Sequence, residues 1–99
     1  MKPYRLSRRA KLDIDRIWLY IAAQSSPEIA DRFLDHLREK FPTLAGMPDI
    51  GRLSDAIEPG LKCFPFRDYL IYYRRAPRGG ILIVRVIHGM RDQQKAWEN

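Results

Sequence analysis

The spacing of the hydrophobic residues changes once along this chain, and that change limits the folds that the chain can adopt. From Ala10 to Phe41 the apolar residues recur every three or four positions, which is the spacing of a buried helix face. Beyond residue 60 they come in short runs rich in aromatic and β-branched side chains, LKCFPF, YLIYYR and ILIVRVIH, which are typical of strands. The sequence therefore predicts an α+β fold in a single domain over residues 1–99.

Cap and turn residues divide the first half of the chain. Residues 2–6, KPYRL, are expected to form a short first strand, after which Ser7 caps a helix. The Ser-Pro pair at 26–27 predicts the start of a second helix, which packs on the first as a hairpin. Pro42 lacks the N–H that an interior turn needs, so we expect a kink or break there. Residues 43–60, with several Gly and Pro, are expected to form a long irregular connection.

The three strand-like runs are expected to form an antiparallel meander with the helix hairpin on one face. Residues 65–68 separate the first two runs, and APRGG separates the second from the third. In the last run, strict alternation places on one face Leu82, Val84, Val86 and His88, and on the other Ile81, Ile83, Arg85 and Ile87. Both faces are mostly apolar, so the face without the helices is expected to be open and to bind a partner protein. The residues after His88 are expected to form a polar tail.

The net charge indicates the kind of partner, and the cysteine content indicates the cellular compartment. The chain carries a net charge of +6 and a pI near 9.8, which favours an acidic partner. One cysteine, Cys63, permits no internal disulfide, and no signal peptide or apolar membrane span is recognisable, so we expect a cytoplasmic protein. With two histidines and one cysteine, no metal site and no cofactor are expected.

The order of the elements, together with four segments, resembles the ParE branch of the RelE/ParE family of toxins from type II toxin–antitoxin modules. The segments are YRLSRRAKLDIDRIWLYIA, FPTLAGMPDIGR, PGLKCFPFRDYLIYYR and ILIVRVIHGMRD, which together cover nearly the whole chain. The resemblance implies a RelE/ParE-like fold and a toxin that blocks DNA gyrase. It also implies a cognate ParD-like antitoxin that neutralises the toxin within a hetero-oligomer.

The RelE branch of the family implies a different activity, ribosome-dependent cleavage of messenger RNA. Such cleavage needs a base for the 2′-OH and cations for the charge that develops on the phosphate. By resemblance, the nucleases carry an arginine where this chain has Leu70, and a tyrosine where it has Trp97. Lys62, His88 and Arg91 remain as a partial catalytic set. The sequence therefore favours a non-enzymatic toxin, with the ribonuclease as the alternative and a basic DNA-binding module as a weaker one.

Residues at the end of the last strand are expected to contact a partner. The partner-binding residues predicted from the sequence are Tyr73, Arg85, His88, Arg91, Asp92 and Trp97. Arg85 stands among isoleucines, and a buried guanidinium must be paired. Its counterpart is either a carboxylate such as Asp13, Asp15 or Asp68, or water, or a bound partner.

Overall fold

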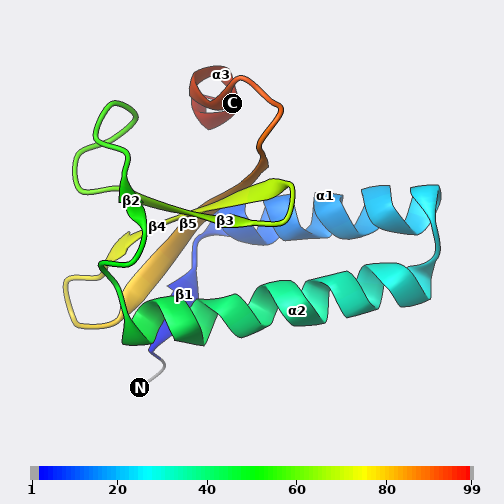
Figure 1. The fold of residues 1–99 in the computed structure, drawn as a ribbon, viewed down its shortest axis with the longest axis horizontal. Helices are drawn as coiled ribbons and strands as arrows, with labels where there is room; N and C mark the ends of the chain where they lie inside the picture. The colour runs from blue at the N-terminus through cyan, green and yellow to red at the C-terminus, as the bar shows by residue number, and fades with distance from the viewer. Residues whose placement is uncertain (1–2, 99) are drawn as a thin grey trace.

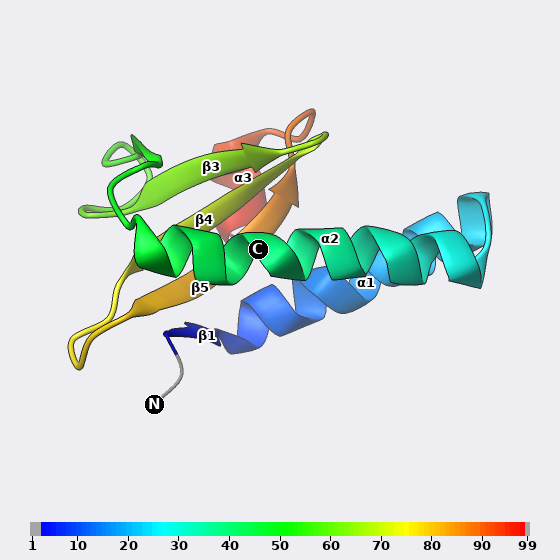
Figure 2. The same cartoon turned by 60° about the horizontal axis from the view of Figure 1, so that its bottom comes forward.

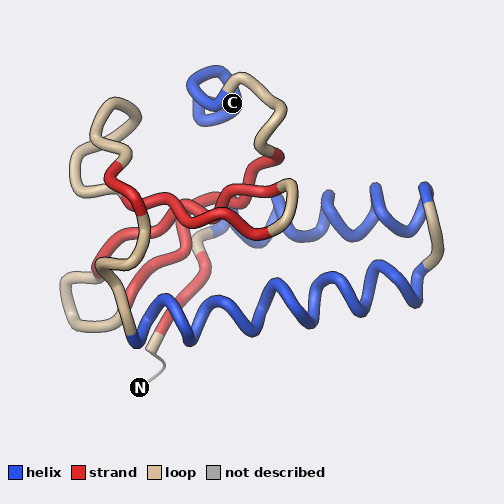
Figure 3. Tube along the Cα trace, viewed as in Figure 1, coloured by secondary structure: helices blue, strands red, loops and turns tan. Residues whose placement is uncertain are grey.

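A helix hairpin packs on one face of a five-stranded sheet in the computed structural model, which describes residues 3–98 (Figure 1). The elements are β1 (Tyr4–Leu6), α1 (Arg8–Gln24), α2 (Pro27–Gly46), β2 (Arg52–Leu53), β3 (Lys62–Phe66), β4 (Tyr69–Arg75), β5 (Ile81–His88) and α3 (Gln93–Glu98). The hairpin extends past the sheet at the end where α1 turns into α2 (Figures 2 and 3). The expected α+β class and helix pair are confirmed.

The sheet is mixed, and the expectation of an antiparallel sheet was wrong at one edge. The strand order is β1-β5-β4-β3-β2, and β1 runs parallel to β5 with Leu6 opposite Ile83. The pairs β5–β4, β4–β3 and β3–β2 are antiparallel, as the short turns between the predicted strands require. A parallel pair needs a long crossover connection, and here the helix hairpin and the rest of the sheet provide it. The first strand is observed at residues 4–6, and residue 2 lies outside the described part.

Both predicted helix starts are confirmed. The hydroxyl of Ser7 accepts a hydrogen bond from the N–H of Ala10 at 3.0 Å, and that of Ser26 accepts one from Ile29 at 3.2 Å. Pro27 occupies the first turn of α2, where its missing N–H removes no helical hydrogen bond.

Of the kink or break predicted at Pro42, the break was wrong, because α2 continues to Gly46. Pro42 is exposed, while its neighbours Phe41 and Leu44 are fully buried against the sheet. Burial of these two side chains stabilises the last helical turn by more than the lost hydrogen bond costs. The irregular connection is correspondingly shorter than residues 43–60, and it contains the two-residue strand β2.

The turn between β3 and β4 is also shorter than predicted. Pro65 is part of β3, opposite Leu70, and only Arg67 and Asp68 connect the strands. β2 pairs with β3 only at residues 62–63, so Pro65 lies where β3 is an edge strand and its missing N–H is tolerated. Arg67 adopts a left-handed backbone conformation, with φ of 53°, as a tight turn of this kind requires.

A β-bulge in β5 overturns the predicted assignment of its faces. Tyr72 pairs with Arg85 and Tyr73 with Ile83, so Val84 is an extra residue on β5. Ile83 and Val86 therefore both face the helix hairpin, whereas strict alternation had placed them on opposite faces.

The second face of the sheet is covered by the chain itself, so the expected open face and polar tail were both wrong. α3 lies on the side of the sheet opposite the hairpin (Figure 1). The apolar cluster on that side contains Leu61, Cys63, Tyr72, Ile87 and Ala96, with Ile57, Leu70, Val84 and Trp97 packed against it. Ala96 and Trp97 lie three or four residues after Gln93, and that spacing turns both toward the sheet.

The phenol of Tyr73 connects the sheet to the loop before β2. Its side chain is fully buried, and its hydroxyl accepts from the N–H of Gly51 at 2.8 Å and donates to the carbonyl of Pro48 at 3.1 Å. A Cβ on Gly51 would lie 2.5 Å from that hydroxyl, so only glycine fits there.

Replacing Tyr73 with phenylalanine is expected to lower the free energy of unfolding by about 1–3 kcal/mol, because the buried Gly51 N–H loses its acceptor. Equilibrium unfolding in urea measures this loss. Tyr20→Phe is the matched control, since the Tyr20 side chain is 60% exposed. Equal stability of the two variants would contradict the proposed role of the Tyr73 hydroxyl.

Candidate functional site

A buried ion pair between α1 and β5 forms the base of the candidate site. Asp13 and Arg85 are 7% and 4% exposed. The Nε and Nη2 atoms of Arg85 donate to the two carboxylate oxygens of Asp13 at 2.7 and 3.1 Å. The Nη1 atom of Arg85 donates to the carbonyl of Ala96 in α3 at 2.9 Å. Of the counterparts predicted for Arg85, Asp13 is the one observed, and the arginine has almost no surface left for a partner.

Asp13 also replaces a missing strand beside β5. β1 stops pairing at Ile83, and Ser7 then donates its N–H to the carbonyl of Ile83 and its hydroxyl to that of Val84. α1 begins at once, and the Asp13 carboxylate accepts the N–H of Val86 at 3.0 Å. Past this point the edge of β5 faces a helix instead of a strand, which leaves room for a groove.

The groove between α1 and the end of β5 has a volume of about 410 Å³. Its lining residues are Asp13, Arg16, Ile17, Tyr20, Tyr69, Val86, Ile87, His88 and Arg91. The structure thus brings together two of the predicted site residues, His88 and Arg91. The sequence interpretation missed the contribution of Tyr20; the available signal was an aromatic residue one helical turn after Arg16 and off the buried stripe.

His88 and Tyr69 form the wall of the groove. Their rings pack edge to face with centroids 5.1 Å apart, and the Nδ1 atom of His88 accepts from the N–H of Met90 at 3.1 Å. Burial, with Tyr20 and Asp68 nearby, raises the pKa of the Tyr69 phenol above its ordinary value. Tyr69 therefore stays protonated near neutral pH and can donate a hydrogen bond, but it is a poor base.

Lys62 lies away from the groove. It pairs with Tyr73 in the sheet, whereas His88 pairs with Tyr69, so the two are separated by about 13 Å along β4 at roughly 3.3 Å per residue. The Lys62 ammonium lies 3.9 Å from the carboxylate of Asp49. Lys62, His88 and Arg91 thus do not converge on one phosphate-sized hollow.

The other predicted partner-binding residues have mainly structural contacts. Tyr73 is fully buried. The carboxylate of Asp92 accepts from the N–H of Lys95 at 3.1 Å and so caps α3. Trp97 packs edge to face on Tyr72 at 5.4 Å.

Tyr72 connects the sheet to α3. Its hydroxyl donates to Oε1 of Gln93 at 2.9 Å. Burial, together with the neighbouring Cys63, raises the pKa of Tyr72 to about 12.

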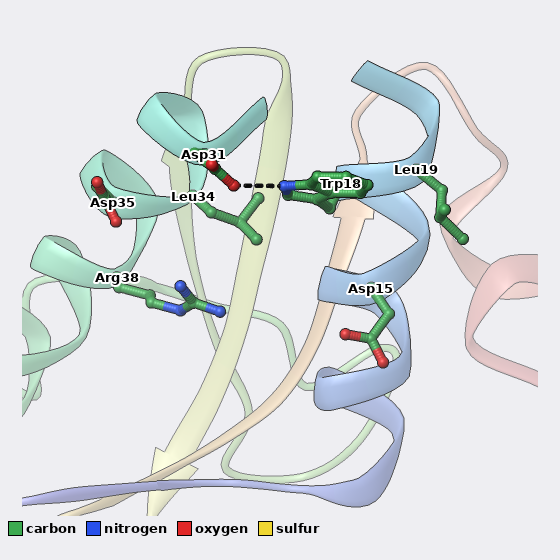
Figure 4. Close-up of a pocket in the computed structure, with 7 residues that line it drawn as sticks. All are labelled: Asp15, Trp18, Leu19, Asp31, Leu34, Asp35 and Arg38. Atoms are coloured by element: carbon green, nitrogen blue, oxygen red, sulfur yellow. Dashed lines mark hydrogen bonds between the residues drawn. The ribbon is translucent and has the colours of Figure 1, made fainter. Parts of the chain in front are cut away.

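A second and larger hollow, of about 630 Å³, lies between α1 and α2 (Figure 4). It is lined by Asp15, Trp18, Leu19, Asp31, Leu34, Asp35 and Arg38. The indole N–H of Trp18 donates to the carboxylate of Asp31 at 2.8 Å and thereby joins the two helices. The hollow is therefore a seam of the hairpin that this hydrogen bond crosses.

Residues 3–98 offer neither a metal site nor a membrane span. No group of three or more His, Cys, Asp or Glu side chains there could hold a metal ion. None of the helices described is long and apolar enough to cross a membrane.

Comparison with known proteins decides the family. The family model described as "ParE toxin of type II toxin-antitoxin system, parDE" matches residues 4–93. The chain belongs to the ParE toxin family. It is therefore a ParE-type toxin of a type II toxin–antitoxin system, as the resemblance of its sequence implied.

Individual relatives agree with this assignment. The toxin is 34% identical over 88 residues to "Toxin ParE1" of Caulobacter vibrioides, covering 89% of this chain and 90% of the relative. It is 30% identical over 89 residues to "Toxin ParE1" of Mycobacterium tuberculosis H37Rv, covering 90% and 91%. A chain from a solved chromosomal ParDE TA system of P. aeruginosa shares the fold, with a TM-score of 0.76 at 21% identity over 86% of this toxin and 92% of that chain.

Removal of the Asp13 carboxylate is expected to destabilise the toxin strongly. In Asp13→Ala, the buried Arg85 guanidinium and the Val86 N–H both lose their acceptor, at a cost of about 3–5 kcal/mol. Thermal and urea unfolding measure the loss. Asp15→Ala, an exposed carboxylate on the same helix, should stay within about 0.5 kcal/mol of the wild type. A loss of the same small size in Asp13→Ala would show that the ion pair does not hold the fold.

The toxin is expected to lose stability between about pH 10 and about pH 12, partly through Tyr72. In that range the folded protein retains the Tyr72 proton while the unfolded chain releases it, so stability falls as the pH rises. Tyr72→Phe should show a shallower fall than the wild type in free energies of unfolding measured at several pH values. An unchanged slope would contradict the raised pKa.

Proposed function

We propose that this toxin acts by binding and blocking DNA gyrase, and that a ParD-like antitoxin neutralises it in a hetero-oligomeric complex. The observation that carries the proposal is the character of the groove between α1 and β5. Arg16 and Arg91 line it, both are exposed, and neither has a carboxylate within 4 Å among residues 3–98. Charged donors around an apolar floor suit the binding of a protein partner.

The same groove is poorly equipped for cleaving RNA, which supports a toxin without catalytic activity. The Nδ1 atom of His88 already accepts a hydrogen bond from Met90, and the raised pKa of Tyr69 leaves that phenol protonated. Lys62, the further cation that a nuclease would need, lies near Asp49 at the opposite end of β4. Stabilising a developing phosphate charge requires several donors aimed at one point.

Ribosome-dependent RNA cleavage is the second candidate, because His88 and Arg91 do line one groove. In that reading His88 would act through Nε2 as the base, and Arg91 would pair with the phosphate. The two candidates make opposite predictions for a variant that lacks the imidazole.

Induced expression with separate measurement of DNA and protein synthesis tests the proposed target. Under the gyrase proposal DNA synthesis stops first, and purified toxin inhibits supercoiling by gyrase. Toxicity then persists in His88→Ala apart from small changes in binding. Addition of the antitoxin from the same operon should restore supercoiling.

If protein synthesis stops before DNA synthesis, the nuclease replaces the gyrase proposal. Early loss of protein synthesis, with ribosome-bound RNA cut by the wild type and left intact by His88→Ala, would establish the nuclease. His88→Asn is a useful companion variant, since its amide can still accept the hydrogen bond from Met90.

A further inference from the structure

Nearly all of the net charge of this chain lies in residues 1–12. This segment contains no Asp or Glu, and its cations are Lys2, Arg5, Arg8, Arg9 and Lys11, so it contributes +5 of the total charge of +6. The remaining residues are almost neutral, with 13 Lys and Arg against 12 Asp and Glu. The charge that indicates an anionic partner is therefore concentrated at the start of the chain.

Three of these cations lie around a hollow at the outer edge of the sheet. β1 is the edge strand, and α1 begins directly after it (Figure 2). Arg5 and Lys11 line a hollow of about 490 Å³ there, together with Tyr4, Leu6 and Leu82. Arg8, three residues before Lys11, is its neighbour on the surface of α1. This basic patch, formed by Arg5, Arg8 and Lys11, shares no residue with the groove between α1 and β5.

The cations of the basic patch have no counter-charge within the described part of the chain. All three are exposed, and none has a carboxylate within 4 Å among residues 3–98. At the other end of the sheet the cations are paired: Lys62, Arg74 and Arg75 each lie within 4 Å of Asp49 or Glu58. The basic patch is thus free to bind an anion from another molecule.

The position of Arg8 is electrostatically unfavourable in the isolated protein. The N-terminus of a helix carries a partial positive charge, which favours acidic residues in the first turn and disfavours basic ones. The first turn of α2 contains Glu28, whereas that of α1 contains Arg8 and Arg9 and no acidic residue. An external anion beside Arg8 would remove this repulsion.

We propose that the basic patch contacts the phosphate backbone of duplex DNA, with Arg5, Arg8 and Lys11 each pairing with a phosphate. This inference goes beyond the gyrase and antitoxin proposals and depends on neither. Long cationic side chains from two adjacent elements can follow a regular row of phosphates, and such contacts carry no sequence information. The binding is therefore salt-dependent and independent of DNA sequence.

Duplex DNA fits the basic patch better than a protein or a single strand does. A protein interface has an apolar core, and none of the exposed large hydrophobic side chains falls within residues 3–11. Single-stranded nucleic acid is held largely by stacking of bases on free aromatic faces. Tyr4 is half-buried and packs on Phe41 with ring centroids 5.5 Å apart, so it offers no such face.

Fluorescence anisotropy of labelled duplex DNA, titrated with purified toxin at several salt concentrations, tests the proposal. For three phosphate contacts the slope of log affinity against log salt is about −2.7, so binding weakens roughly 40-fold between about 50 and about 200 mM salt. Arg5→Ala, Arg8→Ala and Lys11→Ala should each make the slope shallower by about one, with any DNA sequence.

Arg32→Ala is the matched control and should leave the slope unchanged. Arg32 is exposed on α2, about 14 Å along the helix from the Phe41 that packs on Tyr4. Circular dichroism checks that each variant is folded. Arg8→Ala should melt no lower than the wild type, because the helix dipole disfavours the arginine that it removes. Weaker DNA binding in that variant therefore reports a lost contact and not a lost fold.

Three results would overturn the inference. One is the absence of DNA binding by the wild type at about 50 mM salt, where phosphate contacts are strong. Another is a set of patch variants that bind DNA as Arg32→Ala does. The third is competition by polyglutamate as effective as that by unlabelled duplex DNA, which would assign the basic patch to an acidic protein. Failure of gyrase inhibition or of antitoxin binding leaves each of these DNA measurements intact, so the two proposals are tested separately.

Discussion

The buried ion pair of Asp13 and Arg85 joins three parts of the chain. It ties the first helix to the last strand, and through the carbonyl of Ala96 it ties both to α3. Burying two charges is costly, and the cost is offset here because the carboxylate also accepts the Val86 N–H and receives two guanidinium donors. The charge of Arg85, which stands among isoleucines in the sequence, is thus buried in the fold and not exposed on its surface.

This interaction also determines where the groove between α1 and the end of β5 lies. Since the Asp13 side chain takes the place of a strand beside Val86, α1 stands next to the sheet edge and a shallow channel remains beyond it. The two arginines that line this channel are Arg16, from a helix, and Arg91, from the segment that follows β5, so they are distant in sequence. The net charge of +6 is consistent with an acidic partner. Two of the positive charges, those of Arg16 and Arg91, lie along the groove.

The second face of the sheet is covered by α3, so it is not an open surface for a partner. An open apolar face was the main reason, at the level of sequence, to expect a protein interface. α3 closes it with Ala96 and Trp97, and the family model ends at residue 93, where α3 begins. The surface that we propose for partner binding is therefore the charged groove at the end of β5, which is lined by the predicted residues His88 and Arg91.

What the sequence by itself determined were local features. The spacing of apolar residues and the caps at Ser7 and Ser26 suffice for the helices, because each depends on neighbours within one or two turns. Only the tertiary structure decided the bulge at Val84, the parallel pairing of β1, the burial of α3 and the choice of Asp13 for Arg85. Asp13 and Arg85 are 72 positions apart. The chain has several carboxylates, and no local sequence pattern specifies which of them tertiary packing places beside the guanidinium.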